Sequence, residues 1–442
     1  MVYRHKSYGD SWLLFTGGGH VDFGSGLETV INAGRQRVKR LLAGADGYGG
    51  ISSSPGVIYD ITDYPVENLQ HLGGSPFFCS RTNPLKNGSV DILLDNLRKH
   101  GEVVVIAFGG EDTLGVANYL FEKHGLPIVG WPKTMDNDNQ GSHATIGYQT
   151  AVRRAAQATR EAFDNAYTNG KIVLLPLFGR KFDWVAGGTA DYGFADYVIP
   201  AEKKGLTLEQ VARDINEVRD RNRDMYGKPF AVVVVSESAS ELSGLRPYLV
   251  KHLPSRELEM DGFDHVKFDH EALVLAMKEA LSDHLGLPIS AFASKILTYH
   301  LRDGKLDPLD ERFARMTAEE CVRLIDSGQF GRSAAIQHPN QSSYWPDEPY
   351  KWTKGADEKP LFVSSVPLEV ASRTKSVADT PFFDYDGLKP TEQMSEFLAT
   401  IIGQKPVNPR DKIVRLKLAV PVGIELKVEK AVAQMEHGQI SV

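Results

Sequence analysis

Apolar residues in this chain are grouped in short runs, and each run is followed by a turn and a segment with helical spacing. Residues 103–108 are continuously apolar, as expected for a strand that is buried on both faces of a parallel sheet. A glycine pair ends this run, and Leu114, Ala117 and Leu120 then recur at helical spacing. A second short apolar run occupies residues 127–130. The pattern predicts a strand, a helix and a parallel strand.

The same alternation continues through most of the chain. We predict further strands at residues 12–15, 172–177, 197–199, 230–235 and 295–299, and helices at residues 27–42, 91–99, 145–163, 208–218, 271–285 and 309–326. The helix that starts at residue 208 follows a capping-box pattern formed by Thr207 and Gln210. Strands that alternate with helices predict the α/β class, with doubly wound, mainly parallel sheets in two domains.

The character of the sequence changes after about residue 338. Residues 340–360 are polar and rich in proline, which predicts an irregular connector. A helix is expected within residues 388–403, and the alternation at residues 413–418 predicts a half-exposed strand. We find no catalytic chemistry in this C-terminal extension.

Composition narrows the class of protein. A chain of 442 residues is long enough for two or three domains, and its net charge of −7 argues against a general nucleic-acid or acidic-membrane binder. Two cysteines give no disulfide framework and favour a reducing compartment. No stretch approaches the roughly 20 apolar residues of a membrane span, and no apolar signal region is seen. We therefore expect a cytoplasmic protein with no membrane or nucleic-acid partner.

Functional-looking residues recur just after the predicted strands. They are Gly18, Glu111, Asp136, Arg180, Glu237 and Arg302. Because open α/β sheets bind their ligands beyond the carboxyl ends of the strands, this recurrence predicts a cleft. Gly18 belongs to a glycine-rich turn that opens a helix, an arrangement that suits phosphate but is common in plain turns as well.

The segment after residue 130 carries the clearest chemistry. Lys133 and Thr134 precede Asp136 and Asp138. Phosphoryl transfer needs a base for the hydroxyl proton, Mg²⁺ on the phosphate oxygens and cations that offset the charge. Glu111 with one loop aspartate fits the metal site, the other aspartate fits the base, and Lys133 fits a phosphate contact. The alternative is a solvated Asp-Asn-Asp turn.

Two motifs together are far more specific than either alone. Phe-Gly-Gly-Glu-Asp-Thr-Leu at residues 108–114 and Pro-Lys-Thr-Met-Asp-Asn-Asp at residues 132–138 resemble the phosphofructokinase family, and within it the branch that uses pyrophosphate. The resemblance covers roughly residues 13–337. It implies the phosphofructokinase fold, with a C-terminal extension, and a Mg²⁺-dependent, reversible transfer of phosphate from pyrophosphate to fructose 6-phosphate.

The resemblance also implies a role for each matching residue. Asp136 corresponds to the base for the 1-hydroxyl, with Thr134, Asp138 and Lys133 as further catalytic residues and Glu111 at the metal position. Donor-binding positions are Gly18, Gly19, Arg81, Asp112 and Lys133. Sugar-phosphate positions are Thr134, Asp136, Lys171, Phe178, Gly179, Arg180, Glu237, Tyr299 and Arg302.

The choice of donor depends on two positions. Members of the family that use ATP have glycine where this chain has Asp112 and Lys133. A carboxylate at residue 112 adds bulk and negative charge where the α-phosphate of a nucleotide would lie, and a lysine at residue 133 supplies a cation for pyrophosphate. One substitution excludes the larger donor and the other attracts the smaller one.

Several positions depart from the family pattern. Tyr299 replaces a histidine, Asp303 adds a negative charge next to Arg302, and Ala293 replaces an arginine of the ATP-using members. Lys171 stands where an arginine of a partner subunit would reach the sugar phosphate, and lysine lacks the bidentate fork of arginine. A different acceptor such as sedoheptulose 7-phosphate, or a weakened enzyme, therefore remains open.

We expect a pyrophosphate-dependent enzyme that acts as a homodimer or homotetramer. The expected organisation is a donor-phosphate domain at residues 1–143, a sugar-phosphate domain at 144–303, a crossing segment at 304–340 and an extension at 341–442. The alternatives are an ATP-using sugar or lipid kinase and a regulatory subunit without activity.

Overall fold

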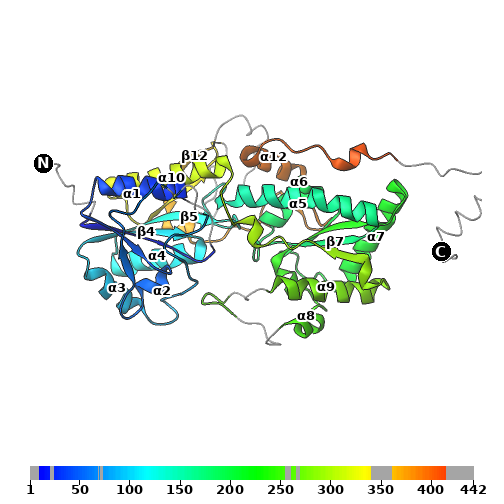
Figure 1. Ribbon diagram of the computed structural model, residues 1–442, viewed down its shortest axis with the longest axis horizontal. Helices are drawn as coiled ribbons and strands as arrows, with labels where there is room; N and C mark the ends of the chain where they lie inside the picture. The colour runs from blue at the N-terminus through cyan, green and yellow to red at the C-terminus, as the bar shows by residue number, and fades with distance from the viewer. Residues whose placement is uncertain are drawn as a thin grey trace, which may run out of the picture.

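The computed structural model describes residues 9–19, 24–67, 69, 73–253, 260–264, 269–339 and 361–414. Two sheets, each covered by helices on both faces, lie side by side along the long axis of the molecule (Figure 1). This arrangement confirms the predicted α/β class with mainly parallel sheets. No helix in these ranges combines the length and the apolar character needed to cross a bilayer.

The first sheet has eight strands. Its order is β12-β11-β5-β4-β1-β2-β3, and β6 pairs with β5. The pairs are parallel except at the two edges, where β3 and β12 run antiparallel to their neighbours. The strands are β1 (Ser11–Thr16), β2 (Arg40–Gly44), β3 (Ile58–Asp60), β4 (Val103–Gly109), β5 (Ile128–Thr134), β6 (Ile146–Gly147), β11 (Arg332–Gln337) and β12 (Phe362–Pro367).

Both faces of this sheet are buried, which explains why its central strands are continuously apolar. In β1, Trp12 and Leu14 pack on one face, and Leu13 and Phe15 pack on the other. The first face is covered by α1 (Gly24–Arg35) and α10 (Pro308–Asp326). The second is covered by α2 (Tyr48–Ile51), α3 (Val90–Arg98), α4 (Glu111–His124) and α11 (Leu368–Ala371).

The second sheet has four strands that are all parallel, in the order β10-β7-β9-β8. They are β7 (Ile172–Pro176), β8 (Tyr197–Ile199), β9 (Ala231–Val235) and β10 (Phe292–Ser294). One face packs against α5 (Tyr148–Asn169), α6 (Trp184–Gly193) and α12 (Glu392–Ile402). The other packs against α7 (Leu208–Tyr226), α8 (Arg246–His252) and α9 (His270–Leu285). As predicted, Thr207 caps α7 by accepting a hydrogen bond from the Gln210 amide.

The C-terminal part of the chain returns to both sheets. β12 adds an antiparallel edge to the first sheet, and α12 packs against α6 on the second. Along the chain between β12 and α12, a two-stranded sheet is formed by β13 (Phe383–Asp384) and β14 (Lys389–Pro390). The helix predicted within residues 388–403 is confirmed by α12. The connector predicted at 340–360 lies outside the described residues, as does most of the strand predicted at 413–418.

Two element predictions were wrong. The helix predicted at residues 27–42 ends at Arg35, and residues 40–44 form β2 instead. A short apolar run cannot be assigned to helix or strand from its periodicity, and pairing with β1 decides this one. The strand predicted at 295–299 lies earlier, at β10, where Phe292 pairs with Ile172 of β7.

Candidate active site

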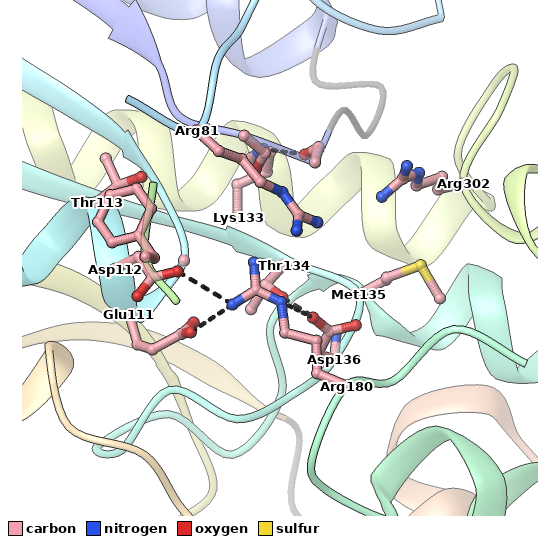
Figure 2. A pocket seen from close by; sticks show the side chains of 14 residues that line it. Arg81, Glu111, Asp112, Thr113, Lys133, Thr134, Met135, Asp136, Arg180 and Arg302 are labelled. Atoms are coloured by element: carbon pink, nitrogen blue, oxygen red, sulfur yellow. Dashed lines mark hydrogen bonds and ion pairs between the residues drawn. The ribbon is translucent and has the colours of Figure 1, made fainter. Parts of the chain in front are cut away.

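A small cavity of about 40 Å³ lies at the carboxyl ends of the strands of the first sheet and of β7 (Figure 2). Its lining comes mostly from the end of β5 and the segments that follow β1, β4 and β5, and it is completed by Arg81, Arg180, Phe263 and Arg302. The lining residues are Gly18, Gly19, Arg81, Gly110, Glu111, Asp112, Thr113, Lys133, Thr134, Met135, Asp136, Arg180, Phe263 and Arg302. Of the six residues expected at a cleft, all but Glu237 line it.

The turn between β4 and α4 presents two carboxylates to the cavity. Gly110 is the N-cap, so Glu111 and Asp112 lie in the first turn of α4, where the positive end of the helix dipole favours negative charge. The turn itself needs glycine, because a Cβ at Gly109 would lie 2.4 Å from the side chain of Thr113. The Gly-Gly-Glu-Asp motif therefore has a local structural cause as well as a chemical one.

Arg180 lies between these carboxylates and the acidic loop (Figure 2). Its Nη1 donates to Glu111 Oε1 at 2.7 Å and to Asp112 Oδ2 at 3.1 Å. Its Nε lies 3.6 Å from Asp136 Oδ2. A single, partly buried guanidinium thus faces three carboxylates. Burial alone would lower the pKa of Arg180, but Glu111, Asp136 and Asp112 together raise it well above its ordinary value.

The backbone around Arg180 is held by two residues that follow β9, the strand that pairs with β7. Glu237, which follows β9, accepts hydrogen bonds from the amides of Gly179 at 3.0 Å and Arg180 at 2.8 Å. Ser238 donates to the carbonyl oxygen of Arg180 at 2.7 Å. These contacts fix Arg180 in the left-handed region, with φ of 51°. Glu237 therefore lies behind the cavity and supports the loop that lines it.

Burial also acts on the carboxyl groups. It raises the pKa of Glu111, an effect that Arg180 opposes and that Asp112 and Asp136 increase. It raises the pKa of Asp112 too, again against the attraction of Arg180. The cavity therefore strongly favours a cation close to this group of carboxylates.

The acidic loop exposes Asp136 to the cavity and buries Asp138. The amide of Asp136 donates to the hydroxyl of Thr134 at 3.1 Å. Asn137 adopts the left-handed conformation, with φ of 57°. Asp138 is fully buried, and neither carboxylate oxygen has a hydrogen-bond partner in the described part of the chain. Burial, together with Glu111 and Asp136, raises the pKa of Asp138 well above its ordinary value.

Lys133 holds the glycine-rich turn in this structure. Its Nζ donates to the carbonyl oxygens of Gly17 at 3.2 Å, Gly18 at 3.1 Å and Gly19. The side chain is 1% exposed, and burial lowers its pKa to about 7. Because an ammonium has three N–H donors, direct binding of a phosphate requires Lys133 to release at least one of these carbonyls.

The remaining positive charge comes from Arg81 and Arg302. Arg81 Nη1 pairs with Asp261 at 2.7 Å, and a Cβ at Gly18 would lie 2.4 Å from the Arg81 side chain. Arg302 stacks on Phe178 and Tyr299, with its guanidinium carbon 4.4 Å and 4.8 Å from the ring centroids. Tyr299, a departure from the family pattern, thus helps to orient Arg302.

Six of the predicted site residues do not line the cavity: Asp138, Lys171, Phe178, Gly179, Glu237 and Tyr299. Lys171 precedes β7, at the opposite end of that strand from Arg180, and its Nζ donates to the carbonyl oxygen of Ser290. Asp303 and Ala293, which depart from the family pattern, lie outside the lining as well. The predicted role of Lys171 would have to be played in the site of another subunit.

Three residues that line the cavity or contact the segments lining it were not identified from the sequence. Asp261 and Phe263 come from a short segment between α8 and α9, and no motif marks them. Lys375 comes from the C-terminal extension and donates to Asn137 Oδ1 at 3.2 Å. A lone lysine in a polar stretch carries no sequence signal of this kind.

The donor set fits Mg²⁺. Carboxylate oxygens are the hard ligands that this ion prefers. Among the residues that the structure describes, none forms a hydrogen bond with the buried carboxylate of Asp138, so its charge lacks a compensating partner in contact. Within the described ranges, no group of three or more His, Cys, Asp or Glu side chains could hold a metal by itself. That is compatible with an ion held by one or two carboxylates and substrate phosphates.

Comparisons with known proteins show which family the chain resembles. The family model for phosphofructokinase matches residues 16–325. A pyrophosphate–fructose 6-phosphate 1-phosphotransferase of Dictyoglomus thermophilum is 31% identical over 277 residues, which are 62% of this chain and 74% of the relative. ATP-dependent 6-phosphofructokinase 2 of Clostridium perfringens is 27% identical over 354 residues, which are 75% of this chain and 89% of the relative.

The fold has a solved counterpart along nearly its whole length. The crystal structure of pyrophosphate-dependent phosphofructokinase from Nitrosospira multiformis superposes with a TM-score of 0.67 at 20% identity, and it covers 93% of this chain and 98% of its own. At that identity the likeness shows the fold. Together with the family match over residues 16–325, it identifies this chain as a member of the phosphofructokinase family.

Proposed function

We propose that the protein is a pyrophosphate-dependent 6-phosphofructokinase. The observation that carries the choice of donor is the carboxylate of Asp112 at the cavity, 3.1 Å from Arg180 Nη1. The α-phosphate of a nucleotide donor would have to lie next to this carboxylate, and the two negative charges would repel each other. Pyrophosphate is shorter and needs no space beyond its two phosphates.

The residues at the cavity support a direct transfer. The oxygen of the 1-hydroxyl of fructose 6-phosphate attacks one phosphorus of pyrophosphate, the bridging P–O bond breaks, and the departing phosphate keeps the electron pair. Asp136 accepts the hydroxyl proton. Arg81 and the amides near Gly18 and Gly19 suit the donor phosphates, and Arg302 suits the phosphate of the sugar.

Glu111, with Asp138 behind it, is the candidate holder of Mg²⁺. Bound Mg²⁺ would offset negative charge on the phosphate oxygens. In the structure, Arg180 supplies the positive charge beside Glu111. The contacts to Glu111 and Asp112 use Nη1 of Arg180, so its Nη2 donors suit a sugar phosphate.

ATP dependence is the second candidate, because ATP-dependent relatives match at similar identity. Initial rates with fructose 6-phosphate, Mg²⁺ and either pyrophosphate or ATP distinguish the two. We expect turnover with pyrophosphate and none with ATP. Turnover with ATP alone would overturn the role of Asp112. If neither donor gives a rate, sedoheptulose 7-phosphate is the next acceptor to assay, and a chain inactive with both acceptors would be a regulatory subunit.

A further inference from the structure

The C-terminal extension runs directly along the acidic loop. The amide of Lys375 donates to the carbonyl oxygen of Asp138 at 2.7 Å, and the amide of Gln140 donates to the carbonyl oxygen of Arg373 at 2.9 Å. Asn139 forms an antiparallel bridge with Thr374. Residues 371–375 therefore form a backbone support for residues 138–140.

The side chain of Lys375 passes beneath this loop and ends among its oxygens. Its Nζ donates to the carbonyl oxygens of Ser142 at 2.6 Å and His143 at 3.1 Å, and to Asn137 Oδ1 at 3.2 Å. It also lies 4.6 Å from the ring centroid of Trp184. The residue is 8% exposed, so water competes little for these hydrogen bonds.

Asn137 is the residue through which this contact can act on the chemistry. It stands between Asp136 and Asp138 and holds the left-handed conformation that turns one carboxylate into the cavity and the other into the interior. Asparagine tolerates this conformation, but the conformation must be selected by contacts. The bond from Lys375 Nζ to the Asn137 amide oxygen provides one such contact.

Lys375 also brings positive charge towards a buried acid. Burial lowers the pKa of Lys375 to about 7, and Asp138 is the charged group that opposes this shift. The hydrogen bonds of Nζ place this charge immediately behind the acidic loop.

We propose that Lys375 is a positioning residue for phosphoryl transfer: it fixes the Asp136–Asp138 loop through Asn137 and so makes the C-terminal extension part of the active site. The inference rests on the proposed function in that Asp136 is the base. It does not depend on which donor is used.

The test compares Lys375→Met with Lys405→Met. Lys405 lies in the same extension and joins it to Asp191, away from the acidic loop, so its loss controls for general loosening of the extension. We expect Lys375→Met to lower kcat about 10- to 100-fold with little change in KM, because a small displacement of a catalytic group slows turnover strongly. Lys405→Met should keep both constants close to wild type.

Asn137→Gly provides a second variant that keeps the left-handed backbone and removes the amide that Lys375 binds. Its kcat should fall as well, and the double variant should be no slower than the slower single variant, since both changes remove the same bond between Lys375 and Asn137. Additive effects in this cycle would overturn the proposal. An unchanged kcat in Asn137→Gly would overturn it even if Lys375→Met did not fold.

Backbone hydrogen exchange tests the proposal independently of turnover. Amides of residues 136–143 should exchange faster in Lys375→Met than in wild type, and they should be unaffected in Lys405→Met. Unchanged exchange in Lys375→Met would overturn the proposal. A wild-type chain that uses ATP alone would instead overturn the proposed donor, because each variant is compared with wild type using the same donor.

Discussion

Arg180 lines the cavity as predicted, but its contacts differ from the role expected of it. The family resemblance implies a sugar-phosphate contact, whereas the side chain lies among Glu111, Asp112 and Asp136. A guanidinium offers several donors in a fixed plane, so it can bridge carboxylates in one arrangement and bind phosphate in another. In the structure, Arg180 therefore compensates part of the negative charge of these carboxylates.

Asp136 is predicted to be the base. Asp136→Asn keeps the size of the side chain and its place beside Thr134 but removes the proton acceptor, so kcat should fall roughly 10²- to 10⁴-fold. Steady-state kinetics would show this fall with a KM for the sugar phosphate close to that of wild type. Turnover near the wild-type rate would assign the base elsewhere, while a thermal melt checks that the variant is folded.

Asp112 is predicted to exclude ATP. Asp112→Gly removes both the charge and the bulk, and we expect the ratio of kcat/KM for pyrophosphate to that for ATP to fall at least about tenfold, which is about 1.4 kcal/mol. Asp112→Asn keeps the bulk and should give a smaller change. Equal ratios in all three proteins would remove Asp112 from donor selection.

At the scale of elements, the first sheet is closed on one face by a close crossing of two helices that are distant in sequence. Gly26 of α1 lies against α10 and β5: a Cβ there would be 2.3 Å from the Trp131 ring and 2.7 Å from the carbonyl oxygen of Ala314. This contact seats the helix that follows the glycine-rich turn. Glycine is required here by proximity and not by its backbone conformation.

Gly26→Ala should therefore destabilise the protein by about 1–3 kcal/mol, because the added methyl overpacks the crossing. Gly115→Ala, a substitution within α4, is the matched control, since the nearest atom to its added Cβ among the described residues is Ser372 Cβ at 3.9 Å. That control should be neutral or stabilising by about 0.5–1 kcal/mol. Urea unfolding of both variants makes the comparison, and equal midpoints would contradict the close contact.

At the scale of the whole molecule, the C-terminal extension joins the two sheets and carries buried polar contacts. Asp183, which precedes α6, accepts hydrogen bonds from the amides of Ala201 and Glu202 and from the hydroxyl of Tyr385. Burial and the neighbouring Glu202 raise the pKa of Asp183 to about 7. The predicted homodimer or homotetramer, in which Lys171 would serve another subunit, stays a prediction that sedimentation can check.

The raised pKa of Asp183 makes stability depend on pH. Between about pH 4, the ordinary value of an unfolded aspartate, and pH 7, the unfolded state loses the proton while the folded state keeps it, so stability falls as pH rises. Asp183→Asn should remove this fall, and its stability relative to wild type should increase from pH 5 to pH 8. Denaturation curves at both pH values test this, with the exposed Asp379→Asn as control; parallel pH profiles for wild type and Asp183→Asn would refute it.

What the sequence alone determined is local or periodic. Buried parallel strands are continuously apolar, helices repeat their apolar face, and the motifs around Glu111 and Asp136 are short and contiguous, so the α/β class and most cavity residues could be predicted. Tertiary structure decided what depends on partners distant in the chain. Residues 40–44 became a strand because β1 pairs with them, Arg180 turned to the carboxylates of another sheet, and Lys375 reached the acidic loop from the C-terminal extension. Such contacts follow from packing between distant segments, and no local pattern records them.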